Sequence, residues 1–150
     1  MYRTIFTIIL CSFCISFSSS LEFTDCGSKV GKFDNVTVSS CDVTKTACEL
    51  VRETTATIYI QFTTEKSIQK VTSICHGILM DVNVPFPLKH PDACVDAGLT
   101  CPLQQGGQYN YQYSLYVDKA YPPLPVTVKW ELQNEDGEDI VCVLIPSKIK

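Results

Sequence analysis

The chain has 150 residues, of which 45% are hydrophobic and 19% are charged, and its formal net charge is −4 at pH 7. A chain of this length forms one domain with a sizeable core. Its acidic balance argues against nucleic-acid binding and polybasic membrane attachment, both of which need clustered cations. We therefore expect a single acidic domain without a nucleic-acid partner.

The first 20 residues have the pattern of a secretory signal peptide. Arg3 precedes an apolar run over residues 5–10, and the small residues 18–20 end the segment. The apolar run is too short to span a bilayer. We predict cleavage before Leu21, which leaves residues 21–150 as the mature domain and, with the loss of Arg3, changes the net charge from −4 to −5.

Hydrophobic residues recur with a period of two along the mature chain, which is typical of strands that bury one face. The alternation is clear over residues 56–63, 109–117 and 126–132, and residues 134–137 predict a turn that leads into a last strand. We expect strands at residues 32–39, 56–63, 71–84, 109–117, 126–132 and 140–145. No segment has a convincing helical period.

Short strands separated by turn signals predict an all-β fold, an immunoglobulin-like β-sandwich of two antiparallel sheets. Prolines fall between the expected strands, where a missing N–H does least harm. These prolines are Pro85, Pro87, Pro91, Pro102, Pro122, Pro123 and Pro125. We therefore expect stiff connections between the strands.

Cysteine spacing is the most informative feature of the mature chain. The chain has nine cysteines. Cys11 and Cys14 fall in the leader, so their spacing is not interpreted as a redox motif, and seven cysteines remain. The seven are Cys26, Cys41, Cys48, Cys75, Cys94, Cys101 and Cys142. Their spacing favours two small closed loops and one bridge between the ends of the mature chain, with Cys75 left over, although six cysteines allow fifteen connectivities. Disulfides persist only in oxidising compartments, so we expect the protein to work outside the cytosol.

Asn35-Val36-Thr37 is an N-glycosylation sequon, which is usable only in the secretory route. It predicts glycosylation at Asn35. Sequons are also common by chance, so the residue pattern leaves its occupancy open.

Signals for catalysis are poor, and we expect neither an enzyme nor a metal or cofactor site. No nucleophile-elbow or zinc motif occurs. His76 follows Cys75 directly, but neighbouring residues of a strand point to opposite faces and cannot form a nucleophile–base pair. We expect His76 to be structural and His90 to be solvated. Cys75 is either a buried free thiol or the partner of an intermolecular bridge.

Two segments combine aromatic residues with prolines, at residues 84–87 and 117–125. They either pack on the core beneath loops or form two rigid lips at the mouth of an apolar cavity between the sheets. A cavity lined by apolar and aromatic side chains suits a lipid.

At these residues the chain resembles the ML (MD-2-related lipid-recognition) domain family, and within it the branch of small lumenal sterol carriers. The resemblance covers nearly all of the mature chain, and the stretch from His76 to Pro87 is its most specific part. The motifs that carry it are Asp25–Ser28, His76–Pro87, Cys101–Pro102, Tyr121–Pro122, Val126–Leu132 and Cys142 with Ile145–Pro146.

The resemblance implies a seven-stranded sandwich whose sheets part to hold a sterol or an acyl chain. It implies the bridges Cys26–Cys142, Cys41–Cys48 and Cys94–Cys101. The residues that match the family's key sterol contacts are Phe86, Val117 and Tyr121, and those that match its wider pocket lining are Ile58, Val84, Leu115, Val128 and Trp130.

The function that the resemblance implies is a monomeric carrier of cholesterol or a related sterol, in secreted fluid or the lysosomal lumen. Such a carrier transfers its lipid to membranes or to a partner such as a membrane sterol transporter or receptor. Val143 stands where the vertebrate carrier has a tryptophan against the ligand, which leaves open a carrier of fatty acids or semiochemicals. A lipid-sensing immune co-receptor of the MD-2 type and an adhesive sandwich without a cavity also stay open at this point.

Overall fold

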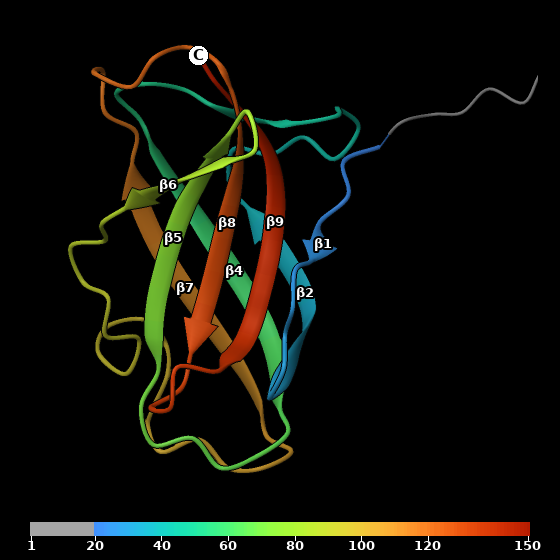
Figure 1. The fold of residues 1–150 in the computed structure, drawn as a ribbon, viewed down its shortest axis with the longest axis vertical. Coiled ribbons are helices and arrows are strands. Elements are labelled where there is room, and N and C mark those ends of the chain that lie inside the picture. Colours follow the sequence, from blue (N-terminus) through green and yellow to red (C-terminus); the bar gives the residue numbers. More distant parts are fainter. Residues whose placement is uncertain (1–19) are drawn as a thin grey trace, which may run out of the picture.

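The computed structural model describes residues 20–150, so the predicted signal peptide, except for Ser20, lies outside the described residues, as do Cys11 and Cys14. The described part of the chain forms nine strands in two facing sheets and contains no helix (Figure 1). Residues 20–150 accordingly include no helix that could cross a membrane. The expected all-β sandwich is confirmed.

The larger sheet has six strands in the order β1-β9-β8-β5-β6, with β3 also pairing with β9. Their bounds are β1 (Thr24–Asp25), β3 (Cys48–Leu50), β5 (Thr72–Leu79), β6 (Val82–Phe86), β8 (Pro125–Gln133) and β9 (Asp139–Ile149). The smaller sheet has the order β2-β4-β7, with β2 (Gly31–Val38), β4 (Thr55–Thr64) and β7 (Gln108–Tyr116). Neighbouring strands are antiparallel except for β3 and β9, which are parallel. The seven strands that the family resemblance implies are therefore supplemented by the short strands β1 and β3.

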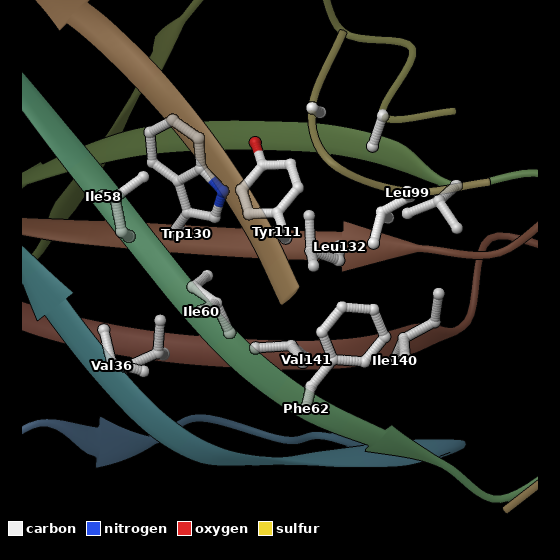
Figure 2. Close-up of a cluster of buried hydrophobic side chains, with 14 of the residues drawn as sticks. Val36, Ile58, Ile60, Phe62, Leu99, Tyr111, Trp130, Leu132, Ile140 and Val141 are labelled. Carbon is white, nitrogen blue, oxygen red and sulfur yellow. The ribbon is translucent and has the colours of Figure 1, made fainter. Parts of the chain in front are cut away.

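The core lies between the two sheets and is filled by the apolar phase of each alternating strand. Its central side chains are Ile58, Ile60 and Phe62 from β4, Tyr111 from β7, Trp130 and Leu132 from β8, and Val141 from β9 (Figure 2). The buried Tyr111 hydroxyl shares a hydrogen bond with Ser73 Oγ at 2.7 Å, which satisfies the only polar group of that side chain.

The C-terminal hairpin forms as the sequence predicts. Asn134 Oδ1 accepts hydrogen bonds from the backbone N–H groups of Asp136 at 3.0 Å and Glu138 at 2.9 Å. Gly137 has a φ of 75°, a left-handed conformation that glycine adopts without steric cost. This turn joins β8 to β9 and so sets the register of the larger sheet.

The single strand expected at residues 71–84 is wrong, because the chain turns back on itself at Met80 and Asp81. These two residues have φ values of 47° and 63°, and Leu79 pairs directly with Val82. Two-residue hairpin turns with positive φ normally use Asn-Gly or Asp-Gly, so Met-Asp gives no turn signal in the sequence.

The expectation that residues 84–87 form a loop is also wrong in part. Val84, Pro85 and Phe86 belong to β6, which is an edge strand of the larger sheet. Proline is tolerated there because the unpaired side of an edge strand needs no N–H donor. Phe86 is consequently held by strand pairing with Cys75 instead of by a free loop.

The three disulfides are those that the family resemblance implies. Cys26–Cys142 links the segment after β1 to β9, and the bridges Cys41–Cys48 and Cys94–Cys101 each close a small loop. Cys75 is a free thiol with 5% of its surface exposed. Its burial agrees with the expected buried thiol and leaves little sulfur accessible for an intermolecular bridge.

Candidate binding pocket

An apolar pocket of about 390 Å³ lies at the end of the sandwich where β5 turns into β6. This end is at the top of the view in Figure 1, where the β5–β6 hairpin, the connection from β7 to β8 and the C-terminus come together. Residues of both sheets line the pocket, from Cys75 and Phe86 on one side to Leu115 on the other. The pocket is therefore an opening between the sheets.

A smaller apolar hollow of about 40 Å³ lies deeper in the sandwich. Some residues line this hollow but not the larger pocket, among them Ile58, Tyr113 and Trp130. Others line both spaces, among them Leu115 and Val128. The shared residues make the two spaces neighbours, so the hollow extends the pocket toward the core.

The structure brings all eight predicted site residues together around these two spaces. Four lie at the larger pocket only, namely Phe86, Val117, Tyr121 and Val84. Leu115 and Val128 lie at the boundary, and Ile58 and Trp130 lie at the inner end. That they contact a ligand remains a prediction.

One rim of the pocket is formed by two aromatic rings from different elements. Phe86 ends β6, and Tyr121 lies in the connection between β7 and β8. Asp118 shapes this connection, because its Oδ1 accepts the Ala120 N–H at 2.8 Å and its carbonyl accepts the Tyr121 N–H at 3.2 Å. Pro122 follows directly and further stiffens the segment. Tyr121 is consequently held in place beside Phe86.

Two titratable side chains at the pocket, Cys75 and Tyr121, are held in their neutral forms. Burial raises the pKa of the Cys75 thiol to about 12. Burial, together with the nearby Asp118, raises the pKa of Tyr121 above its ordinary value. The wall thus presents a neutral thiol and a neutral phenol at physiological pH, which suits an uncharged apolar ligand.

His76 also borders the pocket, but its ring is not arranged to activate Cys75. His76 Nδ1 lies 3.4 Å from Glu131 Oε2, and Lys129 Nζ lies 3.2 Å from the other oxygen of that carboxylate. Because adjacent residues of a strand point to opposite faces, the imidazole and the inward thiol lie on opposite sides of the sheet. The expected structural role of His76 agrees with this geometry.

One cluster contains residue types that often bind metal ions, but its side chains are already engaged in other interactions. Glu131, Asp139 and Cys142 bring their potential ligand atoms close together. The sulfur of Cys142 is bonded to Cys26 and is not available as a thiolate ligand. Lys129 already pairs with Glu131, so the cluster does not fit a metal ion.

Sequence reasoning missed pocket residues that come from β3 and the end of β9. Leu50 and Ile149 both line the larger pocket, and they are register partners in the parallel β3–β9 pair. A strand of 3 residues carries no periodic signal. Leu124 is also part of the wall, and its position in the proline-rich segment 117–125 was the available signal.

The match to known proteins covers the whole described domain. Residues 20–149 match the family model of the ML domain. The chain is 46% identical over 145 residues to NPC intracellular cholesterol transporter 2 homolog a of Drosophila melanogaster, covering 97% of this chain and 98% of that protein. It is 35% identical to NPC intracellular cholesterol transporter 2 of Mus musculus, covering 95% and 93% of the two chains. A crystal structure of a Niemann-Pick type C2 protein from Japanese carpenter ant has a TM-score of 0.83 at 41% identity, covering 86% of this chain and 99% of that one.

Proposed function

This chain belongs to the ML domain family, and from that premise we propose that it carries a sterol, cholesterol or a close relative, in the pocket between its sheets. As a member of this family it is a non-enzymatic binding protein. The observation that carries the proposal is the apolar opening between the sheets, around which all eight predicted contact residues gather. Two of the relatives described above are named as cholesterol transporters.

The size and chemistry of the pocket support a small apolar ligand. Its volume of about 390 Å³ falls in the range of about 300–1,000 Å³ that is usual for small-molecule sites. Burying a dozen methylene groups contributes roughly 10 kcal/mol, whereas association costs about 4–15 kcal/mol. Useful affinity therefore requires a preformed pocket. The stiff connection at Pro122 and the bridge Cys26–Cys142, which ties the segment after β1 to β9 within the larger sheet, supply that preorganisation.

The neutral wall favours a sterol over a fatty acid. A sterol has one uncharged hydroxyl group, whereas a fatty acid brings a carboxylate that is costly to bury without a cation. The charged pair of Lys129 and Glu131 lies with His76 on the other face of the sheet and is not available to it. A fatty acid is therefore the second candidate, with its carboxylate held outside the mouth.

An exposed apolar hairpin beside the mouth supports transfer of the lipid to a membrane or to an acceptor protein. Met80 at the β5–β6 turn is 99% exposed, and Val82 and Val84 on β6 are 60% and 43% exposed. Val84 also lines the pocket. Contact through this tip lets an apolar ligand leave the pocket without crossing bulk water.

The bridges support an oxidising compartment as the place of work. Together with the predicted leader, they lead us to propose secreted fluid or the lysosomal lumen. From the family resemblance we also propose a monomer as the working form.

A blocking variant tests the pocket directly. Leu115 lines both apolar spaces, so Leu115→Trp is expected to fill the passage between them and to weaken binding of a fluorescent sterol at least tenfold. Tyr116→Trp is the matched control, because it places the same side chain one residue further along β7, on the exposed face. Circular dichroism and urea unfolding establish that both variants are folded.

Titrations with a fluorescent sterol and, separately, with a fluorescent fatty acid distinguish the two candidates. We expect the wild type to bind the sterol with a Kd below about 10 μM, which corresponds to a binding free energy of about −7 kcal/mol. If only the fatty acid binds, the sterol assignment is wrong and the carrier function stands. If neither probe binds, or Leu115→Trp binds as well as Tyr116→Trp while folded, the carrier function is wrong.

A further inference from the structure

We propose that Asn35 carries an N-linked glycan whose first sugars lie in a polar trough on the outer face of the small sheet. The trough has a volume of about 400 Å³ and crosses all three strands. The side chains that matter for the argument are Asn35 and Thr37 from β2, Tyr59 and Gln61 from β4, and Asn110 and Gln112 from β7. The sequon thus forms one wall of the space that its glycan would occupy.

A β-bulge turns the sequon outward. Phe33 packs against the core, and an unbroken strand would place Asn35 on the same inner face, two residues later. The register instead passes from Phe33 opposite Phe62 to Asn35 opposite Gln61, which leaves Asp34 as the extra residue. Asn35 and Thr37 are consequently both exposed on the outer face.

Hydrogen bonds across all three strands hold this bulge. Thr63 Oγ1 of β4 donates to Asp34 Oδ2 at 2.7 Å, and Gln108 Nε2 of β7 donates to the same oxygen at 3.4 Å. The Thr63 hydrogen bond lowers the pKa of Asp34, so the carboxylate remains an ionised acceptor. The sequon is therefore presented by a bulge that is built into the sheet.

The trough has the chemistry that sugars contact. Gln61 is the register partner of Asn35, and Tyr59 is the register partner of Thr37. Tyr59 is 46% exposed, although it is a large aromatic residue in the central strand of the sheet. An aromatic ring packs against the C–H face of a pyranose, and amide side chains both donate to and accept from its hydroxyl groups.

A glycan in this position would also protect the sheet. The strand β2 is an edge of the small sheet, and unpaired edges invite pairing with other chains. A bulky polar glycan at Asn35 blocks such pairing. The pocket lies between the sheets, on the other side of β4, so the glycan leaves the mouth free.

The first measurement is the mass of the full chain, leader included, expressed in cultured insect cells. We expect the wild type and Thr37→Ser to lose mass on treatment with an amidase that releases N-glycans, and Thr37→Ala and Asn35→Gln to lose none. The matched Thr37 variants separate the sequon from the side chain itself. A wild-type chain without a glycan, whether secreted or retained in the cells, overturns the proposal.

The second measurement tests the packing by release of the glycan from the folded protein. Tyr59→Ala should release it several-fold faster than the wild type, with equal rates after denaturation. Tyr116→Ala is the control, because Tyr116 is 53% exposed in the small sheet but does not line the trough. The packing of the glycan on Tyr59 is wrong if the folded wild type and Tyr59→Ala release the glycan at the same rate. It is also wrong if Tyr59→Ala and Tyr116→Ala release it equally fast. Glycosylation at Asn35 and the proposed lipid carriage both require the secretory route and are otherwise independent. Asn35→Gln should therefore bind sterol as the wild type does.

Discussion

Phe86 and Tyr121 meet edge to face at the mouth of the pocket, with ring centroids 5.5 Å apart and ring planes inclined by 73°. The two rings come from β6 and from the connection between β7 and β8, which are far apart in the chain. Each ring limits the movement of the other. The pair therefore holds one rim of the pocket in a single arrangement before any ligand arrives.

Phe86→Ala and Tyr121→Ala are expected to weaken sterol binding, and to do so in a coupled way. A buried phenylalanine contributes about 1.5–3 kcal/mol, so Phe86→Ala should weaken binding by up to about a hundredfold. Edge-to-face pairs contribute about 0.5–1.5 kcal/mol beyond burial, and the double variant should therefore lose less than the sum of the single losses.

The measurement is a double-mutant cycle from titrations with a fluorescent sterol. The exposed Tyr59→Ala serves as the control, since it removes a tyrosine outside the pocket and should leave the Kd unchanged. Strictly additive losses would show that the rings act independently, and unchanged binding in both single variants would remove them from the site.

Cys75 should resist alkylation in the folded protein. Burial raises the pKa of its thiol from 9.0 to about 12, which lowers the thiolate fraction at pH 8 by about a thousandfold. The Cys75 side chain is also buried, so the reagent has little access to its sulfur atom. We expect iodoacetamide to leave the native protein unlabelled and to add one group after unfolding in guanidinium without reductant. Rapid labelling of the native chain, or more than one group after unfolding, would contradict the buried thiol or the three bridges.

Glu138 should stabilise the fold above its ordinary pKa and lose that effect in acid. Hydrogen bonds from Lys66 and Asn134 lower the pKa of Glu138 from 4.5 to about 2. Because the folded pKa is the lower one, the contribution is complete above pH 4.5 and disappears as the pH falls from about 4.5 to about 2.

Glu138→Gln tests this pH dependence. The free energy of unfolding of the wild type should exceed that of the variant at pH 7 and still at pH 5, and the two values should converge near pH 2. Urea unfolding at several pH values measures both proteins. A difference that stays constant across this range would assign the effect to packing instead of ionisation.

Alternating patterns made most of the sandwich predictable. Residues on β4, β7 and β8 repeat with a period of two because each strand buries one face, and this signal is local. The same phase places Ile58, Leu115 and Val128 inward, where all three line the small hollow behind the pocket. The family resemblance added Phe86 and Tyr121, which periodicity does not identify.

The parts that could not be predicted depend on contacts between distant segments or on unusual backbone. Leu50 and Ile149 reach the pocket only because β3 pairs with the end of β9, and nothing in either segment encodes that pairing. The bulge at Asp34 depends on Thr63 and Gln108 from two other strands. The hairpin at Met80 and Asp81 has residues that are unfavourable for its conformation, so the usual turn signal is missing.

That unfavourable turn leads to a last prediction, which separates stability from transfer. Met80 and Asp81 both have positive φ, and such a conformation costs a non-glycine residue roughly 1 kcal/mol or more. Asn-Gly suits this two-residue turn best. The double substitution Met80→Asn/Asp81→Gly should therefore raise the free energy of unfolding by about 1 kcal/mol. Because it removes the most exposed apolar side chain beside the mouth, it should also slow the transfer of a fluorescent sterol from the protein to phospholipid vesicles.

Asp96→Gly is the matched control for this variant. Asp96 also has a positive φ, of 54°, but it lies in the connection between β6 and β7 and does not line the pocket. This change should stabilise the fold by a similar amount and leave the transfer rate unchanged.

If the turn variant gains stability and still transfers sterol at the wild-type rate, the exposed Met80 is not part of the transfer surface. If both variants slow transfer equally, the effect comes from rigidity of the fold and not from the apolar tip. Slower transfer in the turn variant alone, with an unchanged Kd for sterol, is the result that we expect, because we propose that the tip contacts the acceptor and because Met80 does not line the pocket.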